Sequence, residues 1–135
     1  MAVQVEGGAG GGRRTGGGGR ARLGRWGEEA AARWYREHGF AVVDRNWRCP
    51  SGELDVVAVQ GRLVVFCEVK ARTGTGWGSP AEAVGGLKQV RVRRAAAAWL
   101  RQARASPGWT GALQARFDVA CVVRGQLVEI LADAF

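Results

Sequence analysis

The segment at residues 52–70 reads GELDVVAVQGRLVVFCEVK, and it predicts the centre of the fold. Two runs rich in valine, 54–59 and 62–69, are separated only by Gln60 and Gly61. This separation is the length of a two-residue hairpin loop, and valine is enriched in strands. We therefore expect an antiparallel hairpin of two buried strands.

Acidic side chains stand at the open end of this hairpin. In the register set by that loop, Asp55 faces Phe66 and lies diagonal to Glu68, so both carboxylates share one face at roughly 7 Å between Cα atoms. Alternation along the strand adds Lys70 to this face, and the register places Glu53 opposite Glu68. Carboxylates gathered in this way repel one another unless water or a cation offsets their charge. The pattern predicts a site for Mg²⁺, with Mn²⁺ as a possible substitute, because Mg²⁺ commonly binds through one or two carboxylates.

Such a site could hydrolyse a phosphodiester. Asp55 and Glu68 would hold the metal ion, and Lys70 would orient the attacking water or lower its pKa. Glu28, in a helical segment, could hold a metal-bound water or a second ion, or simply face solvent. Lys88 could contact a phosphate or support Glu68, or be an ordinary exposed lysine.

Patterns on both sides of the hairpin complete the expected fold. We expect a helix over 23–38, a strand over 40–47, a helix from about 80 to 105, and strands over 117–123 and 127–131. The crossover through the second helix should make the strands before and after it parallel. The order α-β-β-β-α-β-β thus predicts an α/β fold with a mixed central β-sheet flanked by helices.

The overall charge favours a polyanionic partner. In 135 residues, 20 Lys and Arg against 12 Asp and Glu give a formal net charge of +8 and a pI near 10.9. Nucleic acid fits this balance, although ribosome-bound and membrane-surface proteins share it. The length corresponds to about one domain.

Composition also divides the chain and indicates its compartment. Residues 1–22 are dominated by glycine with interspersed arginines, which predicts a disordered basic tail before a single domain at 23–135. No signal-peptide pattern is present, and no apolar run approaches the ~18 residues that span a bilayer. Cys49, Cys67 and Cys121 are far apart and lack the spacing of a zinc site. We expect a cytoplasmic protein with reduced cysteines and no membrane partner.

Several short motifs together resemble a known family. Over residues 23–135 the chain is similar to the YraN family of small bacterial proteins, itself similar to the PD-(D/E)XK nuclease superfamily and, within it, to archaeal Holliday junction resolvases. The motifs that carry the resemblance occur in order: Gly27-Glu28, Arg45-Asn46, Gly52-Glu53-Leu54-Asp55, Val65-Phe66-Cys67-Glu68-Val69-Lys70, Ala83-Val84 with Lys88, and Arg116-Phe117-Asp118-Val119.

The resemblance implies a restriction-endonuclease-like core and assigns site residues. Asp55 corresponds to the superfamily's Asp, and Glu68 and Lys70 to its acid-x-lysine pair. Glu28 corresponds to the helical Glu of the resolvases, and the carbonyl of Val69 would be an additional metal ligand. These residues match the motif positions one by one.

Two functions stay open at this point. The first is an Mg²⁺-dependent DNA endonuclease acting on branched or repair-intermediate DNA, for which a two-fold homodimer would suit a four-way junction. The second is a catalytically silent protein that binds DNA or structured RNA. Trp77, in a glycine-containing loop after Lys70, could stack on an unpaired base, and Lys88 could contact a phosphate. A dinucleotide-binding interpretation of that loop is weak and is set aside, because its glycine spacing is incomplete and no acidic residue stands at the end of a following strand.

The aromatic residues of the helices have a simpler expected role. Trp26, Trp34 and Trp99 fall at helical positions, and we expect them in the core. His38 stands at the end of the first helix and is expected to partner its C-terminal carbonyls rather than act as a catalytic base.

Overall fold

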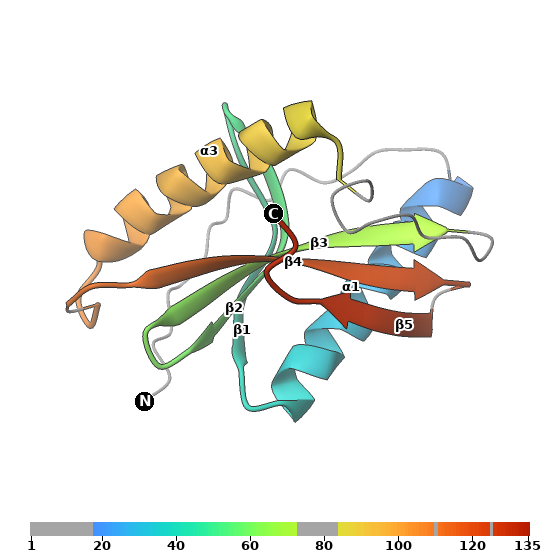
Figure 1. Ribbon diagram of the computed structural model, residues 1–135, viewed down its shortest axis with the longest axis horizontal. Coiled ribbons are helices and arrows are strands. Elements are labelled where there is room, and N and C mark those ends of the chain that lie inside the picture. Colours follow the sequence, from blue (N-terminus) through green and yellow to red (C-terminus); the bar gives the residue numbers. More distant parts are fainter. Residues whose placement is uncertain (1–17, 73–83, 110, 125) are drawn as a thin grey trace.

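The computed structural model describes residues 18–72, 84–109, 111–124 and 126–135 (Figure 1). Over these residues the element order is the predicted one, and the five described strands form a single sheet in the order of the chain. The fold is α/β with a mixed sheet, consistent with a restriction-endonuclease-like core. The elements are α1 (Gly18–Glu37), β1 (Ala41–Cys49), β2 (Gly52–Gln60), β3 (Leu63–Arg72), α3 (Gly86–Arg104), β4 (Gln114–Val123) and β5 (Gln126–Leu131).

The sheet combines antiparallel edges with one parallel pair at its centre. β1 pairs with β2, β2 with β3, and β4 with β5, all antiparallel. β3 and β4 are parallel over ten residue pairs, from Leu63↔Gln114 to Arg72↔Val123. The connection between them includes α3, so the predicted crossover is confirmed.

The two helices cover opposite faces of the sheet (Figure 1). On the α3 face, Trp99 meets Phe66 edge-on, with ring centroids 5.7 Å apart. On the α1 face, Tyr35 packs in a second cluster that includes Val65 and Cys67. Because strand residues alternate between faces, Glu68 continues the α3 face of β3 on which Phe66 lies.

The β2–β3 hairpin is present, but its loop lies one residue later than predicted. Gln60 pairs with Leu63, so the two loop residues are Gly61 and Arg62. Gly61 has φ of +58°, and glycine at the first of two loop positions matches the type II′ pattern. Moving the loop by one residue shifts each cross-strand pairing by two, so each residue keeps its face of the sheet.

The structure also corrects the helix boundaries. α1 begins at Gly18, so the predicted tail boundary at residue 22 falls inside the helix; Arg20, Ala21 and Arg22 are good helix formers that the glycine content obscured. Residues 1–17 lie outside the described part. α3 begins at Gly86, later than predicted, and its N-cap Gly85 is extended, with φ of −64° and ψ of 158°. The predicted helical residues 80–83 lie outside the described residues, so the correction concerns Val84 and Gly85, which precede the helix.

The tryptophan predictions have mixed outcomes. Trp99 is 2% exposed and lies in the core, and Trp34 is half-buried. Trp26 is 57% exposed, so its predicted core position is wrong. It lies on the side of α1 opposite Ala31, which faces the sheet. The His38 prediction is confirmed, because its Nδ1 donates to the Trp34 carbonyl at 2.7 Å.

The helices and the cysteines bear on two further predictions. In the described part of the chain, no helix is both long and apolar enough to cross a bilayer. Cys49, Cys67 and Cys121 are all free thiols, as predicted. Burial raises the pKa of the Cys67 thiol well above its ordinary value, so this thiol stays protonated and packs as a small apolar group.

Candidate metal centre

Asp55 and Glu68 meet where the β2–β3 ladder ends. The last recorded pair is Val56↔Cys67, and continuing this register by one step sets Asp55 directly opposite Glu68. The predicted diagonal relation is therefore replaced by a closer one, on the predicted face. Both side chains are buried, with exposed fractions of 8% for Asp55 and 3% for Glu68.

Burial and the neighbouring acid change the protonation of Glu68. Burial raises its pKa to about 10, helped by the negative charge of Asp55 and a hydrogen bond with it, while the charge of Lys88 lowers it. At neutral pH without a cation, the carboxyl group of Glu68 therefore retains a proton. Its Oε2 atom is buried and has no hydrogen-bond partner among the described residues. A divalent cation could replace the proton and satisfy this oxygen.

Val69 brings a backbone group to the same place. Its N–H donates to Oδ2 of Asp55 at 2.9 Å. The N–H and C=O of one strand residue point to the same neighbouring strand, so the Val69 carbonyl is also directed toward β2. This orientation suits the ligand role that the family resemblance implies.

Among the described residues, no three His, Cys, Asp or Glu side chains are arranged to hold a metal ion. The candidate centre is instead two carboxylates, Asp55 and Glu68, beside a backbone carbonyl. This donor set fits Mg²⁺, which usually retains several waters, better than it fits Zn²⁺, whose protein sites are built mainly from His and Cys.

A glycine lets α1 approach β3 closely at Val69. A Cβ atom on Gly27 would lie 2.9 Å from Cγ1 of Val69, a distance that side chains do not tolerate. The helix thus contacts β3 directly at the residue whose N–H binds Asp55. Glu28, next in sequence, is buried, with an exposed fraction of 3%. The solvent-facing alternative for Glu28 is wrong.

Strand β1 holds α1 through two successive side chains. Nδ2 of Asn46 donates to Oε2 of Glu28 at 2.7 Å. Nη1 of Arg45 donates to Oε2 of Glu29 at 2.6 Å, and the Arg45 bond and charge lower the pKa of Glu29. Together these bonds fix the direction in which the Glu28 carboxylate points.

Asn46 was not identified from sequence as a site residue. It lies at the β1 position opposite Asp55, between the pairs Arg45↔Val56 and Trp47↔Leu54. Its φ of +51° is left-handed, a conformation that asparagine tolerates better than most residues. The available signal was an asparagine within a predicted strand, where this residue type is depleted. The left-handed backbone conformation, which the sequence does not show, explains why asparagine suits this position.

The two lysines occupy different positions. Lys70 is half-buried, follows Glu68 by two residues on the same strand, and pairs in register with Cys121 of β4. Lys88 is exposed in the first turn of α3, and its charge acts on Glu68. Trp77 lies outside the described residues.

Glu53 is not opposite Glu68, so that prediction is wrong. It pairs with Arg48 of β1, with Oε2 at 3.2 Å from the arginine Nε. The reason is the displaced hairpin loop, which sets position 53 opposite Lys70 when the register is continued. The charge of Glu53 still contributes to raising the pKa of Glu68.

A further buried carboxylate, that of Asp118, has a structural role. It is fully buried and accepts bonds from the Tyr35 hydroxyl at 2.6 Å, from Arg116 twice at 2.8 Å, and from the Asp133 N–H at 3.0 Å. Tyr35 stands two turns after Glu28 on α1. Asp118 therefore fixes the helix that carries Glu28 to the sheet and to the C-terminal segment.

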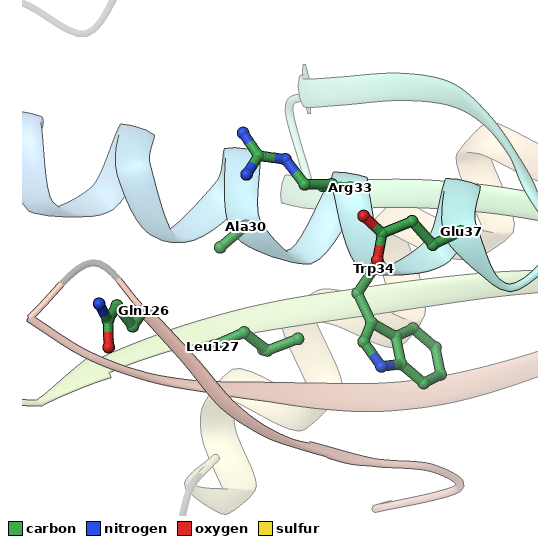
Figure 2. Close-up of a pocket in the computed structure, with 6 residues that line it drawn as sticks. All are labelled: Ala30, Arg33, Trp34, Glu37, Gln126 and Leu127. Atoms are coloured by element: carbon green, nitrogen blue, oxygen red, sulfur yellow. The ribbon is translucent and has the colours of Figure 1, made fainter.

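A shallow hollow lies elsewhere, between α1 and β5. Figure 2 shows Trp34 and Leu127 below Arg33 and Glu37. The hollow that these residues line has a volume of about 280 Å³. Its lining contains none of the carboxylates of the candidate centre. We therefore do not assign the hollow to the same chemistry.

Comparison with known proteins adds a family context. A family model described as Uncharacterised protein family UPF0102 matches residues 27–122. A UPF0102 protein of Frankia alni is 50% identical over 117 residues, which cover 84% of this chain and 93% of that relative. Another, of Acidothermus cellulolyticus, is 42% identical over 125 residues, covering 86% and 95%. A third, of Rhodococcus opacus, is 44% identical over 117 residues, covering 84% and 95%.

Proposed function

The chain belongs to Uncharacterised protein family UPF0102, the YraN family that its motifs resemble, and from this premise we propose that it is a metal-dependent phosphodiester hydrolase acting on nucleic acid. The specific form of the proposal is a DNA endonuclease of PD-(D/E)XK type that uses Mg²⁺ and acts on branched or repair-intermediate DNA. The observation that carries it is the buried contact between Asp55 and Glu68, in which one carboxylate oxygen has no partner among the described residues.

Burial of this pair argues for a ligand rather than for stability. Two carboxylates side by side in a low-dielectric environment destabilise the folded chain unless a proton or a cation is shared between them. Hydrophobic residues at these strand positions would pack without that cost. When bound there, Mg²⁺ would polarise a phosphoryl oxygen and make water a better nucleophile.

The pair and the residues around it would each have a defined role in the proposed reaction. Asp55 and Glu68 would bind the ion, with the Val69 carbonyl beside them. Lys70, on the face of Glu68, would orient the attacking water or donate to a phosphate oxygen. Glu28, held by Asn46, would hold a further water in place.

The compartment follows from the same proposal. Nucleic acid and Mg²⁺ are both present in the cytoplasm, and the three free cysteines suit a reducing environment. We therefore propose that the protein acts there.

The test is a substrate panel with matched variants. The purified protein is incubated with labelled duplex DNA, single-stranded DNA, a four-way junction and structured RNA, with Mg²⁺, with Mn²⁺ or with chelator. Cleavage is expected only with metal, and it should disappear in Asp55→Asn and Glu68→Gln. The control is Glu129→Gln, which removes an exposed carboxylate on β5 and should cut like the parent. Binding without any cleavage across the panel would replace this proposal by a silent nucleic-acid-binding function.

A further inference from the structure

The outward face of α3 is strongly basic. The helix contains six basic residues and no acidic residue in its 19 positions. Its apolar side, which includes Val92, Ala95 and Trp99, is buried against the sheet. On the opposite side, residues recur at intervals of three and four, which is one face of a helix. We call this face the outer stripe, and its members are Leu87, Val90, Arg94, Ala97, Arg101 and Arg104, all exposed.

The positive charge of the outer stripe is not balanced within the described structure. The ion pairs recorded there involve arginines of α1, β1 and β4, and none includes Arg94, Arg101 or Arg104. Arg93, on the flank of α3, is used differently: its guanidinium lies 4.8 Å from the ring centre of Phe117 and 5.6 Å from that of Phe135. That arginine packs against the C-terminal segment, whereas the stripe arginines face solvent.

The stripe leads away from the candidate metal centre. Lys88, in the first turn of α3, is close enough for its charge to act on Glu68. The first part of the helix lies close to the start of β2, because a Cβ on Gly52 would be 3.3 Å from the Arg91 carbonyl oxygen. From Lys88 to Arg104 a helix rises about 24 Å, which is roughly seven base pairs of duplex length.

We propose that the outer stripe binds the phosphate backbone of duplex nucleic acid and directs it to the carboxylate pair. The proposal rests on the proposed function, since it names the form of substrate that this site receives. A rigid row of arginines matches the regular backbone of a duplex, where phosphate contacts position the protein without reading sequence. Proteins that bind single strands usually add aromatic residues on which bases stack, and the stripe has none.

A membrane surface fits the stripe less well. Helices that lie in a membrane interface insert an apolar face containing large residues such as Trp, Phe or Leu. The apolar face of α3 is instead covered by the sheet, and only Leu87 and Val90, exposed by 68% and 43%, remain outside at one end. Duplex nucleic acid is therefore the partner that the charge distribution favours.

The experiment compares two triple variants with the same change in charge. One carries Arg94→Gln, Arg101→Gln and Arg104→Gln; the other carries Arg33→Gln, Arg62→Gln and Arg124→Gln, which are exposed arginines outside α3. Binding of a blunt DNA duplex of about 30 base pairs is measured by fluorescence anisotropy in chelator, over a series of salt concentrations. Circular dichroism and thermal unfolding establish that both variants fold, and the single variant Arg101→Gln provides a milder change.

The stripe variant should bind at least tenfold more weakly than the parent, while the control changes by less than threefold. The slope of log K against log salt should decrease by about 0.9 for each phosphate contact removed. Equal losses in the two variants, equal binding of a single strand of the same length, or preference for vesicles of anionic lipid would overturn the proposal. Because chelator prevents metal-dependent cleavage, this result is independent of whether the substrate panel shows hydrolysis.

Discussion

The side-chain amide of Asn46 donates a 2.7 Å hydrogen bond to the carboxylate of Glu28, and it does so from a left-handed backbone conformation within a strand. The bond joins β1 to α1 beside the position of Asp55. Residues held in sparsely populated conformations are frequently associated with functional sites, where surrounding structure compensates for the strain. Asn46 is therefore a positioning residue for Glu28 in the proposed reaction.

Two substitutions at Asn46 distinguish the effect of its side-chain amide from the effect of its left-handed backbone conformation. Asn46→Gly keeps the positive φ without strain but removes the donor, so we expect a folded protein in which kcat falls about tenfold, as for residues that orient ligands. Asn46→Ala should lose the same activity and also about 1–2 kcal/mol of stability, because alanine is strained at this φ. Single-turnover cleavage and urea unfolding measure the two effects. Parental activity in Asn46→Gly would show that the amide does not position Glu28.

Metal binding is expected to release a proton. Burial and the charge of Asp55 raise the pKa of Glu68 to about 10, so the pair holds a proton at pH 7.5 when no cation is bound. A divalent ion requires the deprotonated carboxylates, and binding should therefore release about one proton per ion. Isothermal titration calorimetry with Mn²⁺ in buffers of different ionisation enthalpy measures this number. An apparent enthalpy that is the same in every buffer would contradict the prediction.

The same carboxyl group makes stability depend on pH. The folded pKa of Glu68 is raised to about 10 from an ordinary value of 4.5, so between these values the folded state binds more protons than the unfolded state. The free energy of unfolding should then fall as pH rises through this window, with a limit of about 1.4 kcal/mol per pH unit for one proton. Urea unfolding in chelator at pH 6 and pH 9 tests the sign.

Glu68→Gln provides the matched comparison for this pH dependence. The amide is neutral throughout, so the variant should lose less stability between the two pH values than the parent. If parent and variant change in parallel, then another group is responsible. Lys70 and Lys88 are present in both proteins, so any contribution they make to the pH dependence of stability cancels in the comparison.

Gly27 sets the distance between α1 and β3. Gly27→Ala would put a Cβ 2.9 Å from the Val69 side chain, and we expect a loss of about 1–3 kcal/mol together with lower activity, because α1 must move with Glu28. Gly86→Ala is the control, since a Cβ there meets nothing within 4 Å. It should leave stability unchanged or raise it by up to about 1 kcal/mol. Equal stability of Gly27→Ala and the parent would show that the contact is easily relieved.

The pairing of Asp55 and Glu68 could be predicted although the register could not. The sequence predicted Gln60 and Gly61 as the loop residues. In the structure the loop residues are Gly61 and Arg62, and Gly61 has the positive φ. Both choices give loops of two residues, and they differ by an even shift in pairing. Alternation therefore keeps the two acids on one face in either case.

Other features depend on contacts that a sequence pattern does not contain. Apolar periodicity predicted helix at Val84 and Gly85, whereas the structure has α3 begin at Gly86 after an extended Gly85. Trp26 has helical spacing like Trp34, yet it falls on the side of α1 away from the sheet. The left-handed conformation of Asn46 accompanies its hydrogen bond to Glu28, a contact between residues far apart in the sequence. Local patterns thus predicted the elements and the acids, while tertiary packing determined the supporting residues.

The parallel pairing of β3 with β4 has a consequence for synthesis of the chain. Glu68 and Val69 lie in β3, and their neighbours Val119 and Ala120 are in a strand that begins only at Gln114. The hairpin of β2 and β3 can form locally, but the strand with the acidic residue remains open on one side until β4 has also left the ribosome. A nascent chain would therefore carry the proposed centre on a strand with one open edge until β4 has paired with β3.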